Sequence, residues 1–189
     1  MKQEQLGREK ILTALKEKLE PLADVNAMWE GGAVCFDRFD EWSDIDLQFD
    51  VNDDFYDEAL KIIMDTLEAL GPIDLRYDLP QPTAHGHFQT FIRLKSTSPF
   101  LLLDMVVMKH SNGERFLEKE IHSEPVVHFD KLGMLAVNTF SKEDHLKAIE
   151  KRLAKMPVVF DLFQVFVKKE IERGNPIEAI GYYMGATLK

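Results

Sequence analysis

Apolar positions along the chain follow two different spacings, which predicts both helices and strands. Over residues 3–19 leucines recur three and four positions apart, which is typical of one buried face of a helix. A second helical stripe covers residues 52–70 and stops at Gly71. Short apolar or alternating runs predict six strands, at 25–30, 45–51, 73–77, 87–94, 100–108 and 126–129.

The runs 87–94 and 100–108 are joined by only five residues, 95–99, which predicts an antiparallel hairpin. After residue 140 the pattern becomes helical. Ser141 and Asp144 resemble a capping box at the start of a helix, and Pro157 is expected to end that helix.

Residues 158–171 are apolar on nearly all sides, so this helix is expected to be buried or to cover a partner, either a second copy of the chain or another protein. A last helix is expected to start at Asn175 and Pro176. The order of elements predicts an α+β fold, with a small mixed β-sheet and flanking helices over residues 1–135 and a short α-helical part over 136–189.

Composition narrows the class of protein. The chain has 189 residues and a formal net charge of −10, which disfavours a polynucleotide partner, since such binding depends on Lys and Arg. Its one cysteine, Cys35, excludes a disulfide framework and a cysteine-based zinc site. No signal peptide and no membrane-spanning run is visible, so we expect a cytoplasmic protein.

The acidity is concentrated in one stretch. Residues 21–80 hold 16 acidic and three basic side chains, a net −13, whereas the rest of the chain nets +3. Within this stretch Asp44 and Asp46 are two residues apart at the start of a strand, so both point to one face. Carboxylates roughly 6 Å apart repel by about 3 kcal/mol, which a divalent cation would offset. The alternative is a common surface pair that faces water or caps a turn.

Two further features bear on whether Asp44 and Asp46 form a metal site: a third aspartate, Asp104, and a pair of glycines, Gly31 and Gly32. Asp104 interrupts an apolar strand, where a carboxylate needs a metal or an ionic partner, and Arg93 on the neighbouring hairpin strand is the competing explanation. The pair Gly31 and Gly32 follows an apolar strand, so its N–H groups could approach phosphate, or it could form a plain tight turn.

Residues 29–33 (WEGGA) and 38–47 (RFDEWSDIDL), with Asp104 as a third acid, resemble the signature of the nucleotidyltransferase superfamily of the DNA polymerase beta type. Within that superfamily, the sequence of residues 38–47 most resembles the antibiotic adenylyltransferases that act on aminoglycosides and lincosamides. This resemblance implies a nucleotidyltransferase fold over the sheet-containing part.

The resemblance also implies roles for individual residues. Asp44 and Asp46 would hold two Mg²⁺ ions, and Asp104 would share one of them. Gly31, Gly32 and Ser43 would cradle the triphosphate of ATP or another NTP, and an acceptor hydroxyl would attack with release of pyrophosphate.

The expected function is therefore a Mg²⁺-dependent nucleotidyltransferase, an adenylyltransferase by resemblance, acting on a hydroxyl of a small acceptor, such as a cationic antibiotic, or of a protein. The acidic stretch favours a cationic acceptor. The alternative is a catalytically inactive binding module, or an antitoxin-like one, that acts through a protein partner by way of residues 158–171.

Overall fold

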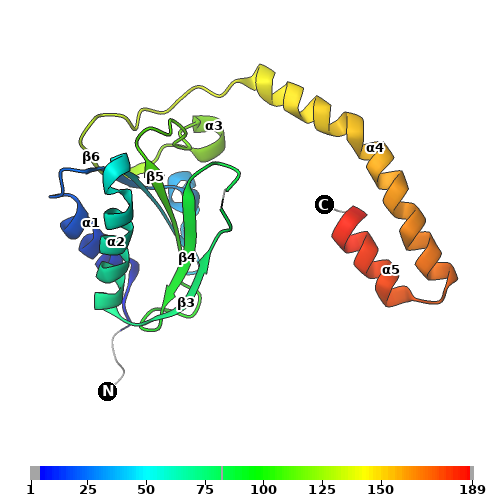
Figure 1. The fold of residues 1–189 in the computed structure, drawn as a ribbon, viewed down its shortest axis with the longest axis horizontal. Coiled ribbons are helices and arrows are strands. Elements are labelled where there is room, and N and C mark those ends of the chain that lie inside the picture. Colours follow the sequence, from blue (N-terminus) through cyan, green and yellow to red (C-terminus); the bar gives the residue numbers. More distant parts are fainter. Residues whose placement is uncertain (1–4, 82, 188–189) are drawn as a thin grey trace. The chain divides into compact units, whose positions relative to one another are not determined.

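The computed structural model describes residues 5–81 and 83–187, and their contacts divide the chain into two units, Met1–Phe140 and Ser141–Lys189. The first unit contains the sheet and the second contains helices (Figure 1). The elements of the first unit are α1 (Arg8–Leu19), β1 (Val25–Glu30), η1 (Gly32–Phe36), β2 (Ile45–Val51), η2 (Asp53–Phe55), α2 (Tyr56–Leu70), β3 (Ile73–Asp78), β4 (Phe88–Leu94), β5 (Leu103–Lys109), α3 (Lys119–His122) and β6 (Val126–Asp130).

The six strands form one mixed sheet in the order β3-β4-β5-β2-β1-β6. The pair β2–β5 is parallel and every other pair is antiparallel. The predicted α+β class and the hairpin of β4 and β5 are therefore confirmed. The parallel pair places the start of β2 beside the start of β5, although α2, β3 and β4 separate the two strands in the chain.

The alternation along β2 gives the sheet two different faces. Ile45, Leu47 and Phe49 are fully buried and belong to the main core, which α1 and α2 cover on one face of the sheet (Figure 1). The intervening residues of β2, the polar ones, point to the opposite face. The main hydrophobic core thus leaves the second face of the sheet free to carry polar groups.

A second, smaller apolar cluster covers part of that opposite face. It brings together side chains from β1, β5 and the segments that follow β5, namely Ala27, Trp29, Val106, Met108, Leu117 and Leu135. Because these segments lie over only part of the face, the start of β2 stays open to a cavity.

The second unit consists of α4 (Lys142–Glu172), α5 (Pro176–Tyr182) and the terminal π-helical turn η3 (Tyr183–Thr187). The predicted cap is confirmed, since Ser141 Oγ accepts a hydrogen bond from the N–H of Asp144. The prediction that Pro157 ends the helix is wrong, because α4 continues through it. Proline removes one hydrogen bond of the helix ladder, and the long run of helix on either side tolerates that local loss.

Within the second unit taken by itself, the apolar stripe of α4 is largely exposed. Within the described part of this unit only Val167 and Ala179 are buried, while Val158 and Leu162 are 72% and 54% exposed. Among the residues that the structure describes, no helix has the length and apolar character that crossing a membrane requires.

Candidate functional site

The start of β2 and the start of β5 form the floor of the candidate site. Asp46 and Asp104 are register partners in the parallel ladder, so they lie on strands about 4.8 Å apart and point to the same face. Both side chains line a cavity of about 240 Å³. Asp44 directly precedes β2 and is exposed, two residues before Asp46. The structure therefore brings together two of the three predicted acids across the sheet and places the third beside them.

The glycine turn lies against the same carboxylate. The N–H of Gly31 donates to the carbonyl oxygen of Asp46 at 2.9 Å, which fixes the turn to the start of β2. Gly32 has φ +69°, and a Cβ atom there would lie 1.8 Å from Asp46 Oδ2. Glycine is required at this position both by its left-handed backbone and by the close approach of the carboxylate. Both glycines line the cavity, as the prediction of a ligand-binding turn requires.

Ser43 lies in a different local environment from the two glycines. Its hydroxyl donates to Asp40 Oδ1 at 2.9 Å and accepts from the N–H of Asp40, so it stabilises the turn before β2. It is absent from the described residues that line the cavity. The structure thus gives Ser43 a part in shaping the loop that carries Asp44.

One arginine joins the two ends of this loop. The Arg8 guanidinium forms an ion pair with Glu30, at the end of β1, and donates at 3.0 Å to the backbone carbonyl of Asp44. His128 Nε2 lies 2.9 Å from the other oxygen of Glu30. Glu30 is only 3% exposed, so these partners are needed to compensate for its burial. Arg8 consequently fixes the position of Asp44 relative to the end of β1, where the glycine turn begins.

The electrostatics at the floor of the cavity are unfavourable without a cation. Burial, with the nearby Asp104 and Asp44 carboxylates, raises the pKa of Asp46 to about 6. Burial and the Asp44 carboxylate also raise the pKa of Asp104, although the amide of Gln89 counteracts this shift by donating to both of its oxygens at 2.7 and 3.0 Å. These are groups in which negative charge is concentrated and incompletely neutralised.

The alternative partner for Asp104 that the sequence offered is wrong. Arg93 forms its ion pair with Asp74 on β3, at 3.0 Å, and not with Asp104. In the ladder Asp104 is opposite Phe91, and the side chain that reaches it comes from Gln89, two residues away from Phe91 on the same face. Because β4 has a strand on each side, Arg93 can turn toward β3 instead.

Several residues of the cavity wall carry no motif and were missed by sequence reasoning. They come from β2, from β4 and the loop before it, and from β5 and the segment after it, and they are Gln48, His85, Gln89, Val106, Phe116, His122, Ser123 and Pro125; Trp29 of the quoted signature also lines the cavity. The ring of Phe116 contacts the rings of His85 and His122, with centroids 5.4 and 5.6 Å apart. Gln48 is the member that period-two spacing from Asp46 could have found.

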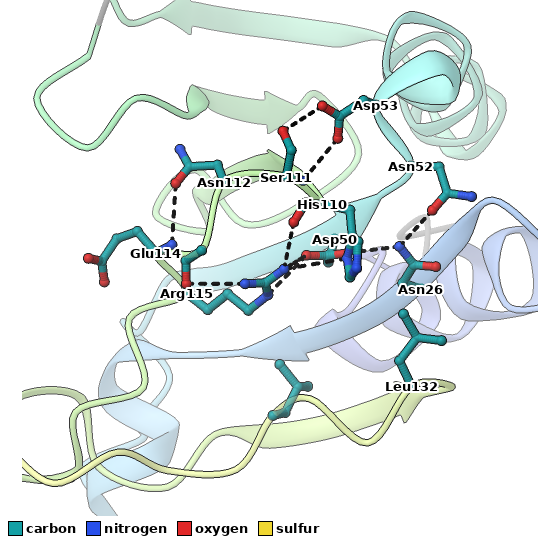
Figure 2. A network of polar contacts seen from close by, with 12 residues as sticks. Asn26, Asp50, Asn52, Asp53, His110, Ser111, Asn112, Glu114, Arg115 and Leu132 are labelled. Carbon is teal, nitrogen blue, oxygen red and sulfur yellow. Dashed lines mark hydrogen bonds and ion pairs between the residues drawn. The ribbon is translucent and has the colours of Figure 1, made fainter.

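A second aspartate of β2, Asp50, lies four residues beyond Asp46 on the same face. Figure 2 shows Arg115, His110 and Asn26 directed at its carboxylate. Arg115 binds Asp50 Oδ2 through Nε and Nη2 at 3.0 and 2.7 Å, and His110 Nδ1 and Asn26 Nδ2 lie 2.8 and 2.9 Å from Oδ1. Asp50 is fully buried and fully partnered. Arg115 therefore also anchors the segment that delivers Phe116, whose φ is +54°, to the cavity wall.

The donors at the floor suit a hard cation. Asp46 and Asp104 offer carboxylate oxygens, which is the chemistry that Mg²⁺ prefers. Within residues 5–81 and 83–187 no group of three or more His, Cys, Asp and Glu side chains is arranged to hold a metal ion by itself. Mg²⁺ commonly completes its shell with water and substrate phosphates, so two protein carboxylates are a sufficient protein contribution.

Comparisons with known proteins do not identify a family. No family model matches this chain, and no curated protein matches it either.

Proposed function

We propose that this chain is a Mg²⁺-dependent nucleotidyltransferase of the DNA polymerase beta type, which transfers a nucleoside monophosphate from an NTP to an acceptor hydroxyl and releases pyrophosphate. The observation that carries the proposal is the register pairing of Asp46 with Asp104 on the floor of a cavity that the glycine turn also lines. The raised pKa values of both carboxyls support it, because they indicate a site that a cation would stabilise.

Asp46 and Asp104, with Asp44 at the rim, are the residues that would hold Mg²⁺. When bound, Mg²⁺ would polarise the α-phosphate and neutralise charge on the attacking and leaving oxygens. The Gly31 N–H is taken by the Asp46 carbonyl, so the N–H of Gly32 is the backbone donor of the turn that would meet a phosphate oxygen beside the Asp46 carboxylate. Gln89 holds the Asp104 carboxylate in a fixed orientation by donating to both of its oxygens.

The proposal also assigns sides to the two reacting groups. The glycine turn is on the β1 side of Asp46. On the far side of Asp104 lie Gln89, which is in β4, and His85, which is in the loop before β4. An in-line displacement needs the attacking and leaving oxygens on opposite sides of the phosphorus. Pyrophosphate would thus leave on the glycine side, and the acceptor hydroxyl would approach over Asp104. The acidic stretch 21–80 favours a cationic acceptor.

The test is release of pyrophosphate from each of the four NTPs with Mg²⁺ and a panel of hydroxyl acceptors that includes aminoglycosides, a lincosamide and tyrosine-containing proteins. We expect Asp46→Asn and Asp104→Asn each to lower transfer at least ~10³-fold, since both would weaken charge stabilisation in the transition state. Asp57→Asn, an exposed acid of α2, is the matched control and should keep full activity. Unchanged transfer in both site variants would contradict the assignment of the site.

The second candidate function is a binding module without transferase activity that acts through a protein partner. The apolar stripe of α4, which is largely exposed within the second unit taken by itself, is the observation that favours it. The same assay separates the two functions, because a chain that binds no Mg·NTP and releases no pyrophosphate would support the module. Binding of Mg·NTP with turnover would support the enzyme.

A further inference from the structure

Gln48 lies between the two aspartates of β2 that already have a role. Asp46, Gln48 and Asp50 alternate along one face of the strand, and Gln48 lines the cavity one step inward from Asp46. Its register neighbours are Trp29 on β1 and Val106 on β5, which also line the cavity. Gln48 thus occupies the floor of the cavity directly behind the carboxylates.

The amide of Gln48 is incompletely hydrogen-bonded. Its Oε1 is buried and has no hydrogen-bond partner among the described residues. On one side the amide packs against the glycine turn, where a Cβ atom on Gly31 would lie 3.1 Å from Nε2. Arg115, a strong donor on the same face, is committed to Asp50. A buried carbonyl oxygen without a donor is destabilising. Because Gln48 lines the cavity, a rotation of its amide would bring Oε1 to a donor on a bound ligand.

The donor must come from a particular part of the nucleotide. Phosphate oxygens accept hydrogen bonds and bring no donor at neutral pH, which excludes the triphosphate as the partner of Oε1. Gln48 is two residues from Asp46 along β2, or about 6.6 Å. The group attached directly to an α-phosphate held at Asp46 is the ribose, and its 2′ and 3′ hydroxyls are donors.

Resting on the function proposed above, we infer that Gln48 is a specificity-determining residue, whose Oε1 accepts a hydrogen bond from a ribose hydroxyl of the bound Mg·NTP. Gly31 contributes to the same arrangement, because its lack of a side chain leaves room for the Gln48 amide. The site consequently selects ribonucleotides over the deoxynucleotide that lacks the recognised hydroxyl. A site built around a substrate hydroxyl rejects the analogue because its own buried group then stays unpaired.

The experiment measures equilibrium binding of four ligands by the full chain in Mg²⁺, namely ATP, 2′-deoxy-ATP, 3′-deoxy-ATP and inorganic tripolyphosphate. We expect the wild type to bind ATP about 10-fold or more tightly than one of the two deoxy analogues. Gln48→Met has nearly the same volume and no carbonyl, so it should bind ATP about 10-fold more weakly and lose the discrimination. Its affinity for tripolyphosphate should stay within about threefold of wild type.

Two further measurements guard against a merely structural effect. Without ligand, Gln48→Met should raise Tm by roughly 2–4 °C, because it removes an unsatisfied buried oxygen. Gln81→Met, at an exposed glutamine outside the cavity lining, is the matched control and should change neither Tm nor binding.

The outcomes separate this inference from the proposed function. Equal binding of ATP and both deoxy analogues by the wild type would overturn the role of Gln48 and leave the nucleotidyltransferase proposal standing. An equal loss for all four ligands in Gln48→Met would overturn it as well. If the wild type binds none of these ligands, both proposals fail.

Discussion

Asp46 and Asp50 are the same residue type on the same face of the same strand, and the protein treats them in opposite ways. Asp50 is fully buried and receives an arginine, a histidine and an asparagine (Figure 2). Asp46 forms no ion pair with any described side chain and instead faces Asp104 across the parallel ladder. A structural carboxylate with full partners therefore lies only four positions from one whose pKa is raised to about 6.

The difference distinguishes a stabilising role from a ligand-binding one. A buried carboxylate can be stabilised by partners from its own chain, and the result is a rigid anchor. A carboxylate left with like-charged neighbours destabilises the free protein and is relieved by a cation. If Asp46 and Asp50 differ in this way, substitutions and Mg²⁺ should affect them in opposite directions.

The largest effect on the free energy of unfolding is expected at Asp50, the aspartate with full partners. Arg115→Met would leave Asp50 buried with its charge largely unpaired, so unfolding free energy should fall by about 3–5 kcal/mol. Urea denaturation followed by fluorescence measures this loss. Arg76→Met, which removes the exposed ion pair with Asp78, is the control and should cost less than about 1 kcal/mol. Equal losses in the two variants would contradict the anchor role of Arg115.

At Asp46, the aspartate without an ionic partner among the described side chains, Mg²⁺ should bind and stabilise the folded chain. At a concentration of 100 times Kd it would add about 2.7 kcal/mol, which raises Tm by roughly 5–10 °C for a chain of this size. Calorimetry with and without a chelator gives the shift. Asp46→Asn should abolish most of it, and a shift of the same size in that variant would place the Mg²⁺ elsewhere.

Neutralising Asp46 should stabilise the protein when Mg²⁺ is absent. Asp46→Asn removes a partly exposed carboxylate that is repelled by Asp104 and Asp44, so we expect a gain of about 1–2 kcal/mol at pH 7 after allowance for solvent screening. The opposite change, a loss of stability together with a loss of transfer, would show that the carboxylate is held by partners as Asp50 is. Chemical denaturation in the presence of EDTA provides the measurement.

The smallest signal is the pH dependence of the same contribution. The pKa of Asp46 rises from 3.8 in the unfolded chain to about 6 in the folded one, so the folded state binds the extra proton between these values. The stability that Asp46 contributes is hence present below pH 3.8, declines as pH rises toward 6 and stays low above it. Wild-type minus Asp46→Asn stability, measured from pH 4 to 7 without Mg²⁺, isolates this decline from the other carboxyls. A difference that does not vary with pH would contradict the raised pKa.

Spacing along the sequence predicted the local features of this region, whereas the proximity of Asp104 to Asp46 was expected only from the family resemblance and the partners of Asp50 were missed. The alternation over β2, the glycine turn before it and the hairpin of β4 and β5 follow from spacing within short segments. The pairing of Asp46 with Asp104 depends on a parallel contact between distant segments, and the partnership of Asp50 with Arg115 spans 65 residues. No local pattern encodes such contacts, since tertiary packing decides them.

The same reason accounts for the individual errors. Arg93 was a reasonable partner for Asp104 from its place on the hairpin, but the neighbouring strand β3 provides Asp74 instead. Pro157 has the strongest local preference against a helix interior, yet α4 extends through it. Gln89, which donates to both oxygens of Asp104, belongs to no motif and could be found only from the register of β4 against β5.

The parallel pairing of β2 with β5 also bears on how the chain folds. β3, β4 and β5 adjoin their neighbours in sequence, whereas β2 meets β5 only after α2, β3 and β4 have intervened. Contacts of such long sequence separation carry a large loop-closure entropy and form slowly. Asp46 and Asp104 come together only at this closure, so their repulsion is absent from the unfolded ensemble and acts on the native state. We therefore expect Mg²⁺ to lengthen the lifetime of the folded chain, with a smaller effect on the rate at which it folds.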